Sequence, residues 1–234
     1  MEVCKITATD GTEVEYINEI IGSGTMKDVY FSPCKQYVVA FYRDKLDVAS
    51  RERLEMITGP YRDSIYNSGN GEYWKNLFCW PEKIVEHNGL TGVVVPAYQS
   101  HFFFEYGSIN NDFLKIKGKE KQGKWFASAN NQNRFLDDNE KGDWLSYLRI
   151  SLIIARAVRR MHAAGLAHSD LSYKNVLISP STGHATIIDV DGLVVPGKFP
   201  PDVVGTPDFI APEVVQTSHL SKNDPARILP SIST

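Results

Sequence analysis

Two side chains suited to proton transfer and metal binding lie close together in the segment HSDLSYKNVL, residues 168–177. Asp170 follows His168 by two residues, and Asn175 follows Asp170 by five. A carboxylate in this setting can accept the proton of an attacking hydroxyl group, and the amide can hold a metal ion on a nucleotide's phosphates. A polar turn before an ordinary strand is the alternative, and the segment alone leaves both open.

A further pair of carboxylates ends the apolar stretch of IIDVDG, residues 187–192. Asp189 or Asp191 would stand at the end of a short strand, where a hard cation such as Mg²⁺ could find carboxylate and phosphate oxygens together. A strand that ends in an Asp-Gly turn is the ordinary interpretation of the same residues.

Two glycine-containing strings complete the set of signals. In IGSGTMKDV, residues 21–29, glycines would let backbone N–H groups approach phosphate oxygens closely, although an ordinary hairpin has the same pattern. The string GTPDFIAPE, residues 205–213, is the most specific feature, because no general requirement of folding produces it.

Hydrophobic periodicity predicts the elements that position these residues. Residues 12–43 read as three strands, TEVEYINEII, KDVYF and YVVAFYR, and two more are expected near 82–87 and 91–95. Residues 47–58 read as a helix that stops near Gly59-Pro60, and 143–164 as a helix with N-cap Asp143 and terminal Gly165. NVLI and ATIID read as short strands, and 99–142 as a long insertion partly ordered by aromatic residues. The pattern is α+β with two lobes that divide near Tyr98.

Composition limits the class of protein. The chain has 234 residues, 42% of them hydrophobic and 23% charged, and a net charge of −3. These values predict a soluble globular protein that binds neither nucleic acid nor membrane, with no signal peptide. Three widely spaced cysteines give no zinc-site spacing and favour a reducing, cytoplasmic setting.

All four signals, in this order, resemble those of the protein kinase family, over about residues 14–215. The resemblance implies a bilobal kinase-like fold with a β-rich N-lobe, 1–97, and a mainly helical C-lobe, 98–234, that carries the insertion at about 99–142. The family continues with several more helices after the string ending at Glu213, so this C-lobe is expected to be truncated, and either the natural protein is longer or something else covers the apolar surface that the missing helices would leave. The segments VVVPAY and YWKNLFCWP are similar to bacterial serine/threonine kinases, in particular those encoded beside a protein phosphatase and a TerY-type von Willebrand domain protein, which are the implied partners.

Residue roles follow from the same resemblance. Asp170 corresponds to the catalytic base, and Asn175 and Asp189 to the Mg²⁺ ligands. Asp189 is preferred because it ends the strand at nearly the family's distance from Asn175, and Asp191 is the alternative if the loop bulges. Lys174 would serve the γ-phosphate, since Ser172 occupies the position where serine/threonine kinases usually have a lysine.

Two departures bear on regulation and specificity. Ser169 replaces the arginine that normally receives an activation-loop phosphate, and residues 193–204 contain no Ser, Thr or Tyr. Activity is therefore expected not to depend on phosphorylation of that stretch. Thr206 favours Ser/Thr substrates, because in the family this residue braces the base of such enzymes.

The nucleotide-binding residues are carried over in the same way. The loop over the phosphates comprises Gly22, Ser23 and Gly24, with Val29 and Ala40 beside the nucleotide. Val95 corresponds to the gatekeeper, and the backbone of Ala97 and Tyr98 to the groups that bond the adenine edge. Either Glu52 or Glu55 would pair with the phosphate-binding lysine.

That lysine is missing from its usual strand, where Tyr42 stands instead. Side chains alternate along a strand, so Lys27 faces the same way as Val29, toward the nucleotide and nearer its phosphates. The string GSGTMKDVY resembles the with-no-lysine kinases, which have their lysine at this place. Arg43 is the alternative cation, but it points to the opposite face unless a bulge shifts the register.

The sequence thus predicts an ATP- and Mg²⁺-dependent serine/threonine kinase that acts on a protein substrate. A pseudokinase, which would use the same fold as a scaffold for nucleotide or partner proteins, is the rival hypothesis. A phosphotransferase for small molecules is disfavoured by GTPDFIAPE, because the family uses that segment to dock a protein substrate.

Overall fold

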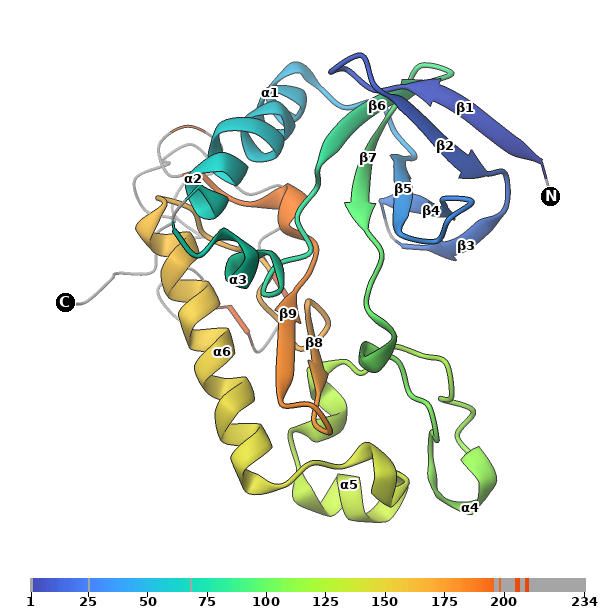
Figure 1. Ribbon diagram of the computed structural model, residues 1–234, viewed down its shortest axis with the longest axis vertical. Coiled ribbons are helices and arrows are strands. Elements are labelled where there is room, and N and C mark those ends of the chain that lie inside the picture. The colour runs from blue at the N-terminus through green and yellow to red at the C-terminus, as the bar shows by residue number, and fades with distance from the viewer. Residues whose placement is uncertain are drawn as a thin grey trace. The chain divides into compact units, whose positions relative to one another are not determined.

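A computed structural model describes residues 2–24, 26–67, 69–195, 198, 205–206 and 209–210 of the chain (Figure 1). The chain forms two compact units, the first made of Met1–Gly71 and Cys79–Ala97 and the second of Glu72–Phe78 and Tyr98–Thr234. Residues 72–78 therefore group with the second unit, whereas the sequence-based division assigned everything before residue 98 to the first.

The first unit contains two antiparallel sheets. One is a hairpin of β1 (Val3–Thr7) and β2 (Glu13–Ile17), and the other is a five-stranded sheet of order β3-β4-β5-β7-β6. Its strands are β3 (Ile20–Ser23), β4 (Lys27–Phe31), β5 (Tyr37–Tyr42), β6 (Lys83–His87) and β7 (Leu90–Pro96). The predicted strand TEVEYINEII is in fact two strands in different sheets, because the chain turns at Asn18–Glu19, and β1 was not expected.

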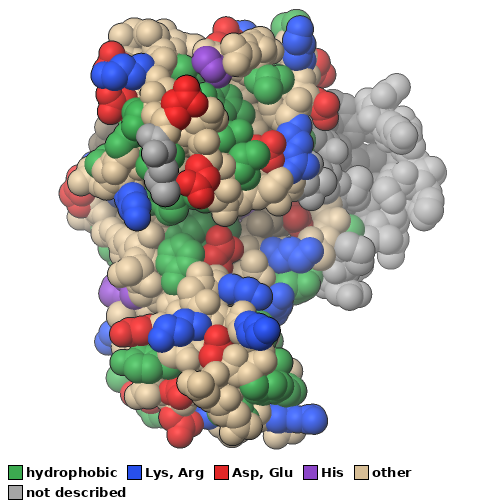
Figure 2. All heavy atoms as spheres, turned by 90° about the vertical axis from the view of Figure 1, so that its right-hand side faces the viewer, with side chains coloured by type: hydrophobic (Ala, Val, Ile, Leu, Met, Phe, Trp, Pro, Cys, Tyr) green, Lys and Arg blue, Asp and Glu red, His purple; other side chains and the backbone are tan. Residues whose placement is uncertain are grey.

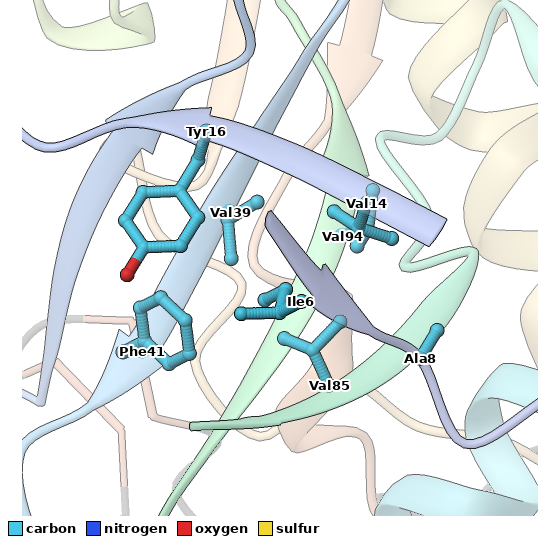
Figure 3. Close-up of a cluster of buried hydrophobic side chains, with 8 residues drawn as sticks. All are labelled: Ile6, Ala8, Val14, Tyr16, Val39, Phe41, Val85 and Val94. Carbon is cyan, nitrogen blue, oxygen red and sulfur yellow. The ribbon is translucent and has the colours of Figure 1, made fainter. Parts of the chain in front are cut away.

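Hairpin β1–β2 covers one face of the larger sheet (Figure 3). Its Ile6, Val14 and Tyr16 pack against Val39 and Phe41 of β5. The Tyr16 and Phe41 rings meet edge to face, with centroids 5.5 Å apart. In β1 only Ile6 is buried, and it belongs to a short alternation in which Cys4 and Ala8 face the same cluster.

The other face of the sheet carries a second apolar cluster. Ala40 and Tyr42 alternate with Val39 and Phe41 along β5, and they pack with Leu54 of helix α1 (Val48–Met56). Asp47 caps this helix, since its side chain accepts a 2.7 Å hydrogen bond from the Ser50 N–H group.

The expected end of this helix near Gly59-Pro60 is wrong. The chain continues through a π-helical turn, Ile57–Tyr61, into α2 (Arg62–Tyr66). Pro60 has no N–H group and would break a regular α-helix, but a wider turn accommodates it. The Ile57 carbonyl accepts from the Arg62 N–H group and also from the Trp80 indole at 2.8 Å, so this irregular turn keeps its acceptor satisfied.

The second unit is built around a long helix and a short hairpin. Helix α6 (Trp144–Ala163) begins at N-cap Asp143 and is followed by Gly165 at φ 74°, which confirms the predicted helix and both of its ends. It runs beside the hairpin of β8 (Val176–Ser179) and β9 (His184–Ile187), as Figure 1 shows. The remaining helices are α3 (Gly71–Lys75), α4 (Ile109–Asp112) and α5 (Ala129–Phe135), with 3₁₀ turns at Ser100–Phe102, Gly123–Phe126, Asp138–Glu140 and Val190–Gly192.

The predicted insertion, 99–142, contributes to the core of this unit. Phe104 and Phe126 stack with centroids 6.2 Å apart and pack in one cluster with Ile150 of α6 and Val176 of β8. The aromatic residues therefore order the segment, as expected.

A buried ion pair further fixes the insertion. Lys121 Nζ lies 2.8 Å from Glu140 Oε2, and the two side chains are 5% and 1% exposed. Glu140 Oε1 accepts hydrogen bonds from the N–H groups of Tyr106 and Gly107, at 2.5 and 3.0 Å. No local pattern indicates this pair, because its members are 19 residues apart in a lysine-rich stretch.

The molecular surface mixes both signs of charge. Basic and acidic side chains are interspersed on the face shown in Figure 2. None of the helices that the structure describes is long and apolar enough to cross a membrane.

Candidate active site

The loop between α6 and β8 holds Asp170 by both carboxylate oxygens. Asp170 Oδ1 accepts a 2.8 Å hydrogen bond from the Thr206 N–H group. Asn175 Nδ2 donates to Asp170 Oδ2 at 3.2 Å and to the Asp170 main-chain carbonyl at 2.7 Å. The carboxylate is half-buried and fixed in orientation, as proton transfer to a positioned group requires.

Gly205 makes the contact with Thr206 possible. Its φ is 108°, and a Cβ atom at this position would lie 2.9 Å from the Ser169 carbonyl oxygen. Any side chain would be strained by the backbone conformation and would clash with the catalytic loop. The local backbone conformation and the nearby Ser169 carbonyl therefore explain why the GTPDFIAPE string begins with glycine.

His168 links this loop to the strand that precedes Asp189. The Asp170 N–H group donates to His168 Nδ1 at 3.2 Å, so the ring proton is assigned to Nε2. Nε2 lies 3.1 Å from the Ile188 carbonyl oxygen and donates to it. His168 therefore orients the loop through two backbone contacts.

Asn175 and Asp189 come together at one end of the β8–β9 hairpin. The strand pairing runs through Val176 and Ile187 and is extended by a 3.0 Å hydrogen bond from the Ile188 N–H group to the Asn175 carbonyl. Because the Asn175 side-chain amide hydrogens serve Asp170, its Oδ1 atom remains as a ligand for a cation.

Asp189 has an unusual backbone. Its φ and ψ are 59° and 42°, in the left-handed region, and its side chain is exposed. Asp191, the alternative ligand, is 8% exposed and lies within the 3₁₀ turn. Strained non-glycine residues cluster at functional sites, which favours Asp189.

Ser172, which stands where the family usually has a lysine, and Lys174, the predicted substitute for that lysine, differ in exposure. Ser172 is buried, and its Oγ accepts a 3.3 Å hydrogen bond from the Lys174 N–H group. Lys174 is exposed, with Nζ 5.9 Å from the centroid of the Tyr173 ring. Ser172 thus shapes the loop, and Lys174 is the residue with a solvent-accessible charge.

In the first unit, strand register brings the predicted nucleotide-binding side chains to one face. Val29 pairs with Ala40 and Lys27 with Tyr42. Val29, Ala40 and Val95 belong to the cluster on that face, and Lys27 Nζ lies 5.4 Å from the centroid of the Tyr42 ring. Lys27 and Val29 share the face because they are two residues apart on β4.

Arg43 lies on the opposite face. It forms a 2.8 Å ion pair with Asp28 and also donates to Ser23 Oγ. A hydrogen bond from the Arg43 guanidinium, followed by one from Ser23, holds the pKa of the Asp28 carboxyl below its usual range. Arg43 and the Ser23 side chain are therefore engaged with each other and with Asp28, so only the backbone of Ser23 remains for a phosphate.

Neither glycine of the predicted phosphate loop is required by its own surroundings. A Cβ atom at Gly22 would lie 3.9 Å from Val29 Cβ, and one at Gly24 would lie 3.7 Å from the Lys27 carbonyl oxygen, both ordinary contact distances. Neither residue has a positive φ. A glycine that the fold does not need is consistent with close approach of a ligand to the backbone.

The structure does not decide between the two helix glutamates. Glu55 accepts from Arg51 at 3.4 Å across one turn of α1, and Glu52 stays a predicted partner for Lys27. Both glutamates are exposed, whereas Arg53 is 5% exposed and is thus buried like Leu54 and Ile57. The sequence signal for Arg53 was its spacing of four residues from Ile57, the period of the buried face.

The predicted hinge needs one correction. The Ala97 N–H group donates to the Gln36 carbonyl at 2.9 Å, so it is not available as a donor to adenine. The Pro96 carbonyl accepts from Cys79 Sγ at 3.2 Å. Tyr98, already in the second unit, has its ring 6.4 Å from that of Phe103. The resemblance to kinases could not indicate that the Ala97 N–H group and the Pro96 carbonyl form hydrogen bonds inside the protein.

Residues 124–224 match the family described as protein kinase domain. The vaccinia related kinase 3 structure superposes with a TM-score of 0.55 at 10% identity, covering 89% of this chain and 59% of that chain. The fold is that of a protein kinase. Much of the activation loop, including residues 199–204, and Ala211–Glu213 of the family string lie outside the described residues.

Curated kinases show the same relationship in sequence. The rat protein "Dual specificity testis-specific protein kinase 1" is 33% identical over 100 residues, which cover 39% of this chain and 16% of that protein. "Death-associated protein kinase dapk-1" of Caenorhabditis elegans is 40% identical over 72 residues, 29% of this chain and 5% of that protein. The matches thus span a small part of each relative's length.

Proposed function

We propose that this protein is an ATP- and Mg²⁺-dependent protein kinase that transfers the γ-phosphoryl group to Ser or Thr of a protein substrate. The observation that carries the proposal is the Asp170 carboxylate, whose two oxygens are held by Asn175 Nδ2 and the Thr206 N–H group. An arrangement of this kind suits a group that must meet one hydroxyl proton in one orientation.

The proposed reaction is an in-line transfer. Asp170 accepts the proton of the substrate hydroxyl as its oxygen attacks the γ-phosphorus, and the bond from that phosphorus to the β–γ bridging oxygen breaks. The products are the phosphorylated side chain and ADP. His168 keeps Asp170 in place through the hydrogen bond that it accepts from the Asp170 N–H group.

Two groups at the end of the β8–β9 hairpin are proposed to hold Mg²⁺. Asn175 Oδ1 and the exposed Asp189 carboxylate are oxygen ligands of the type that this cation prefers, with phosphate oxygens and water as the others. When bound, Mg²⁺ neutralises phosphate charge. Lys174 is proposed to face the γ-phosphate.

The first unit is proposed to supply the nucleotide cradle. Lys27 would meet the phosphates under the Gly22–Gly24 backbone, with Glu52 as its carboxylate partner and Val29, Ala40 and Val95 beside the base. The shared face of Lys27 and Val29 on β4 supports this role. Position 42, where the family has its lysine, is a tyrosine that lies across the sheet ladder from Lys27.

Finer assignments rest on the sequence. We infer Ser/Thr specificity from Thr206, and independence from activation-loop phosphorylation from Ser169 and the absence of hydroxyl residues in 193–204. A bacterial, cytoplasmic kinase that functions with a protein phosphatase and a von Willebrand domain protein remains the proposed setting.

A nucleotide-binding pseudokinase is the second candidate. The engaged Ala97 N–H group and the tyrosine at position 42 favour it, because both remove a group that the family uses for ATP. Transfer of labelled phosphate separates the two functions.

The test is transfer of radiolabelled phosphate from ATP to casein and to myelin basic protein. We expect transfer by the natural sequence, and a fall of about 10²–10⁴-fold in kcat for Asp170→Asn, the usual contribution of a positioned acid or base. Asp63→Asn, an exposed carboxylate on α2, is the control and should leave kcat unchanged. ATP binding without transfer would favour the pseudokinase, and unchanged turnover in Asp170→Asn would remove Asp170 from the mechanism.

A further inference from the structure

The insertion is joined directly to the catalytic loop by its backbone. The Gly123 N–H group donates to the Tyr173 carbonyl at 3.1 Å, and the Ile178 N–H group donates to the Lys121 carbonyl at 3.0 Å. Gln122 and Leu177 form a β-bridge between the same two segments. The 3₁₀ turn Gly123–Phe126 is therefore held beside the residues that follow Asp170.

This contact places a second lysine at the catalytic loop. Lys124 Nζ lies 6.0 Å from the centroid of the Tyr173 ring, and Lys174 Nζ lies 5.9 Å from the same centroid. Lys124 is also 5.6 Å from the centroid of Trp125. One aromatic ring thus carries two ammonium groups, each from a different segment, at the distance of a cation–π contact.

Both charges face solvent. Lys124 and Lys174 are exposed, and neither forms an ion pair with any residue that the structure describes. Tyr173 is half-buried and is covered on one side by Phe209, with ring centroids 5.4 Å apart. The rigid ring holds the positive charges close to the loop.

A peptide that presents its hydroxyl group to Asp170 must pass this surface, because Tyr173 and Lys174 follow Asp170 by only three and four residues. We infer that the Lys124–Tyr173–Lys174 surface selects protein substrates with acidic residues next to the phosphorylated Ser or Thr. The inference rests on the proposed function and adds a substrate class to it. Lys124 is the specificity residue, because Lys174 is already assigned to the γ-phosphate.

Electrostatics sets the expected size of the effect. An exposed ion pair changes a binding constant by a small factor, and reversing one charge replaces attraction with repulsion. We therefore expect Lys124→Glu to lower kcat/KM for an acidic peptide by about threefold to tenfold, mainly through KM. The effect should shrink at high salt.

The experiment compares three peptides that differ only in the residues flanking one serine, which are Glu, Ala or Lys. The natural sequence should prefer the Glu peptide, and Lys124→Glu should lose that preference or favour the Lys peptide. Lys117→Glu is the matched control, since Lys117 is an exposed lysine of the same insertion and its side chain makes no contact with the catalytic loop. The control should keep the natural preference.

Binding of the same peptides, measured by fluorescence anisotropy, separates this inference from the proposed function. Phosphate transfer with equal rates for the three peptides, or an equal response to both charge reversals, would overturn the acidic specificity and leave the kinase function standing. Absence of transfer would overturn the kinase function. If the Glu and Lys peptides then also bound with equal anisotropy, the inferred preference of the Lys124–Tyr173–Lys174 surface for acidic peptides would be overturned as well.

Discussion

The catalytic loop and the nucleotide face of the first unit hold their polar groups by different means. Hydrogen bonds from Asn175 and Thr206 fix both oxygens of Asp170. Lys27, by contrast, is placed by strand alternation, which determines the face of the sheet and leaves the long side chain to find the phosphates. A proton acceptor needs a fixed orientation, whereas an ammonium group acts as a point charge on a flexible stem. Under the proposed function, this difference would let the phosphate-binding lysine occupy a neighbouring strand while the base keeps its position.

Glycines in the two regions show the same contrast. Gly205 is required by its own fold, because a Cβ atom would lie 2.9 Å from the Ser169 carbonyl oxygen. Gly22 and Gly24 meet no such obstacle, since a Cβ atom there would make only ordinary contacts. Internal contacts therefore explain the glycine of the first region, and the proposed nucleotide would explain those of the second.

The predicted metal ligand Asp189 should show a large effect on ATP binding. Asp189→Asn should weaken the Mg²⁺-dependent increase in ATP affinity by at least about 10–100-fold, the loss typical even of a residue that only supports a metal ligand. Titration calorimetry with ATP, with and without Mg²⁺, measures it.

Asp191→Asn is the matched control, because Asp191 lies two residues further on and is buried. It should leave the Mg²⁺ effect unchanged. The reverse result, with Asp191→Asn alone removing the effect, would move the metal site to Asp191.

An effect on stability instead of on ligand binding is expected where the insertion supports the catalytic loop. Lys121→Met leaves the Glu140 carboxylate buried without its cation, so the free energy of unfolding should fall by about 3–5 kcal/mol in a urea titration. Lys75→Met breaks an exposed pair with Glu72, with side chains 50% and 87% exposed, and should cost at most about 1 kcal/mol. Equal losses in the two variants would show that the buried pair contributes no more than a surface one.

Local patterns predicted much of the fold. The α6 helix has an Asp cap and a terminal glycine as predicted, whereas Leu145, Leu148 and Leu152 of its hydrophobic period are exposed and its buried residues are Ile150, Ala157 and Met161. The strands on either side of the Gly22–Gly24 turn were also predicted, from the alternation of apolar and polar residues. The π-helical turn at Pro60 could not be predicted, because the Trp80 indole that bonds the Ile57 carbonyl comes from 23 residues further along the chain.

Some features of the candidate site were likewise predictable from local sequence, and others were not. Spacing and motif order pointed to Asp170, Asn175 and Asp189, which the β8–β9 hairpin and its preceding loop bring to one end. Patterns gave no indication that Ala97 gives its N–H group to Gln36 or that Lys124 reaches Tyr173. Both facts depend on contacts between segments far apart in sequence.

Relocation of the lysine is the central claim, and phosphate transfer by three variants tests it most directly. Lys27→Met should lose nearly all activity, and the double variant Lys27→Met/Tyr42→Lys should recover part of it, because Tyr42 pairs with Lys27 across the strands on the same face. Arg43→Met should keep most activity, since Arg43 is paired with Asp28 on the opposite face. Loss of activity in Arg43→Met together with full activity in Lys27→Met would contradict the account.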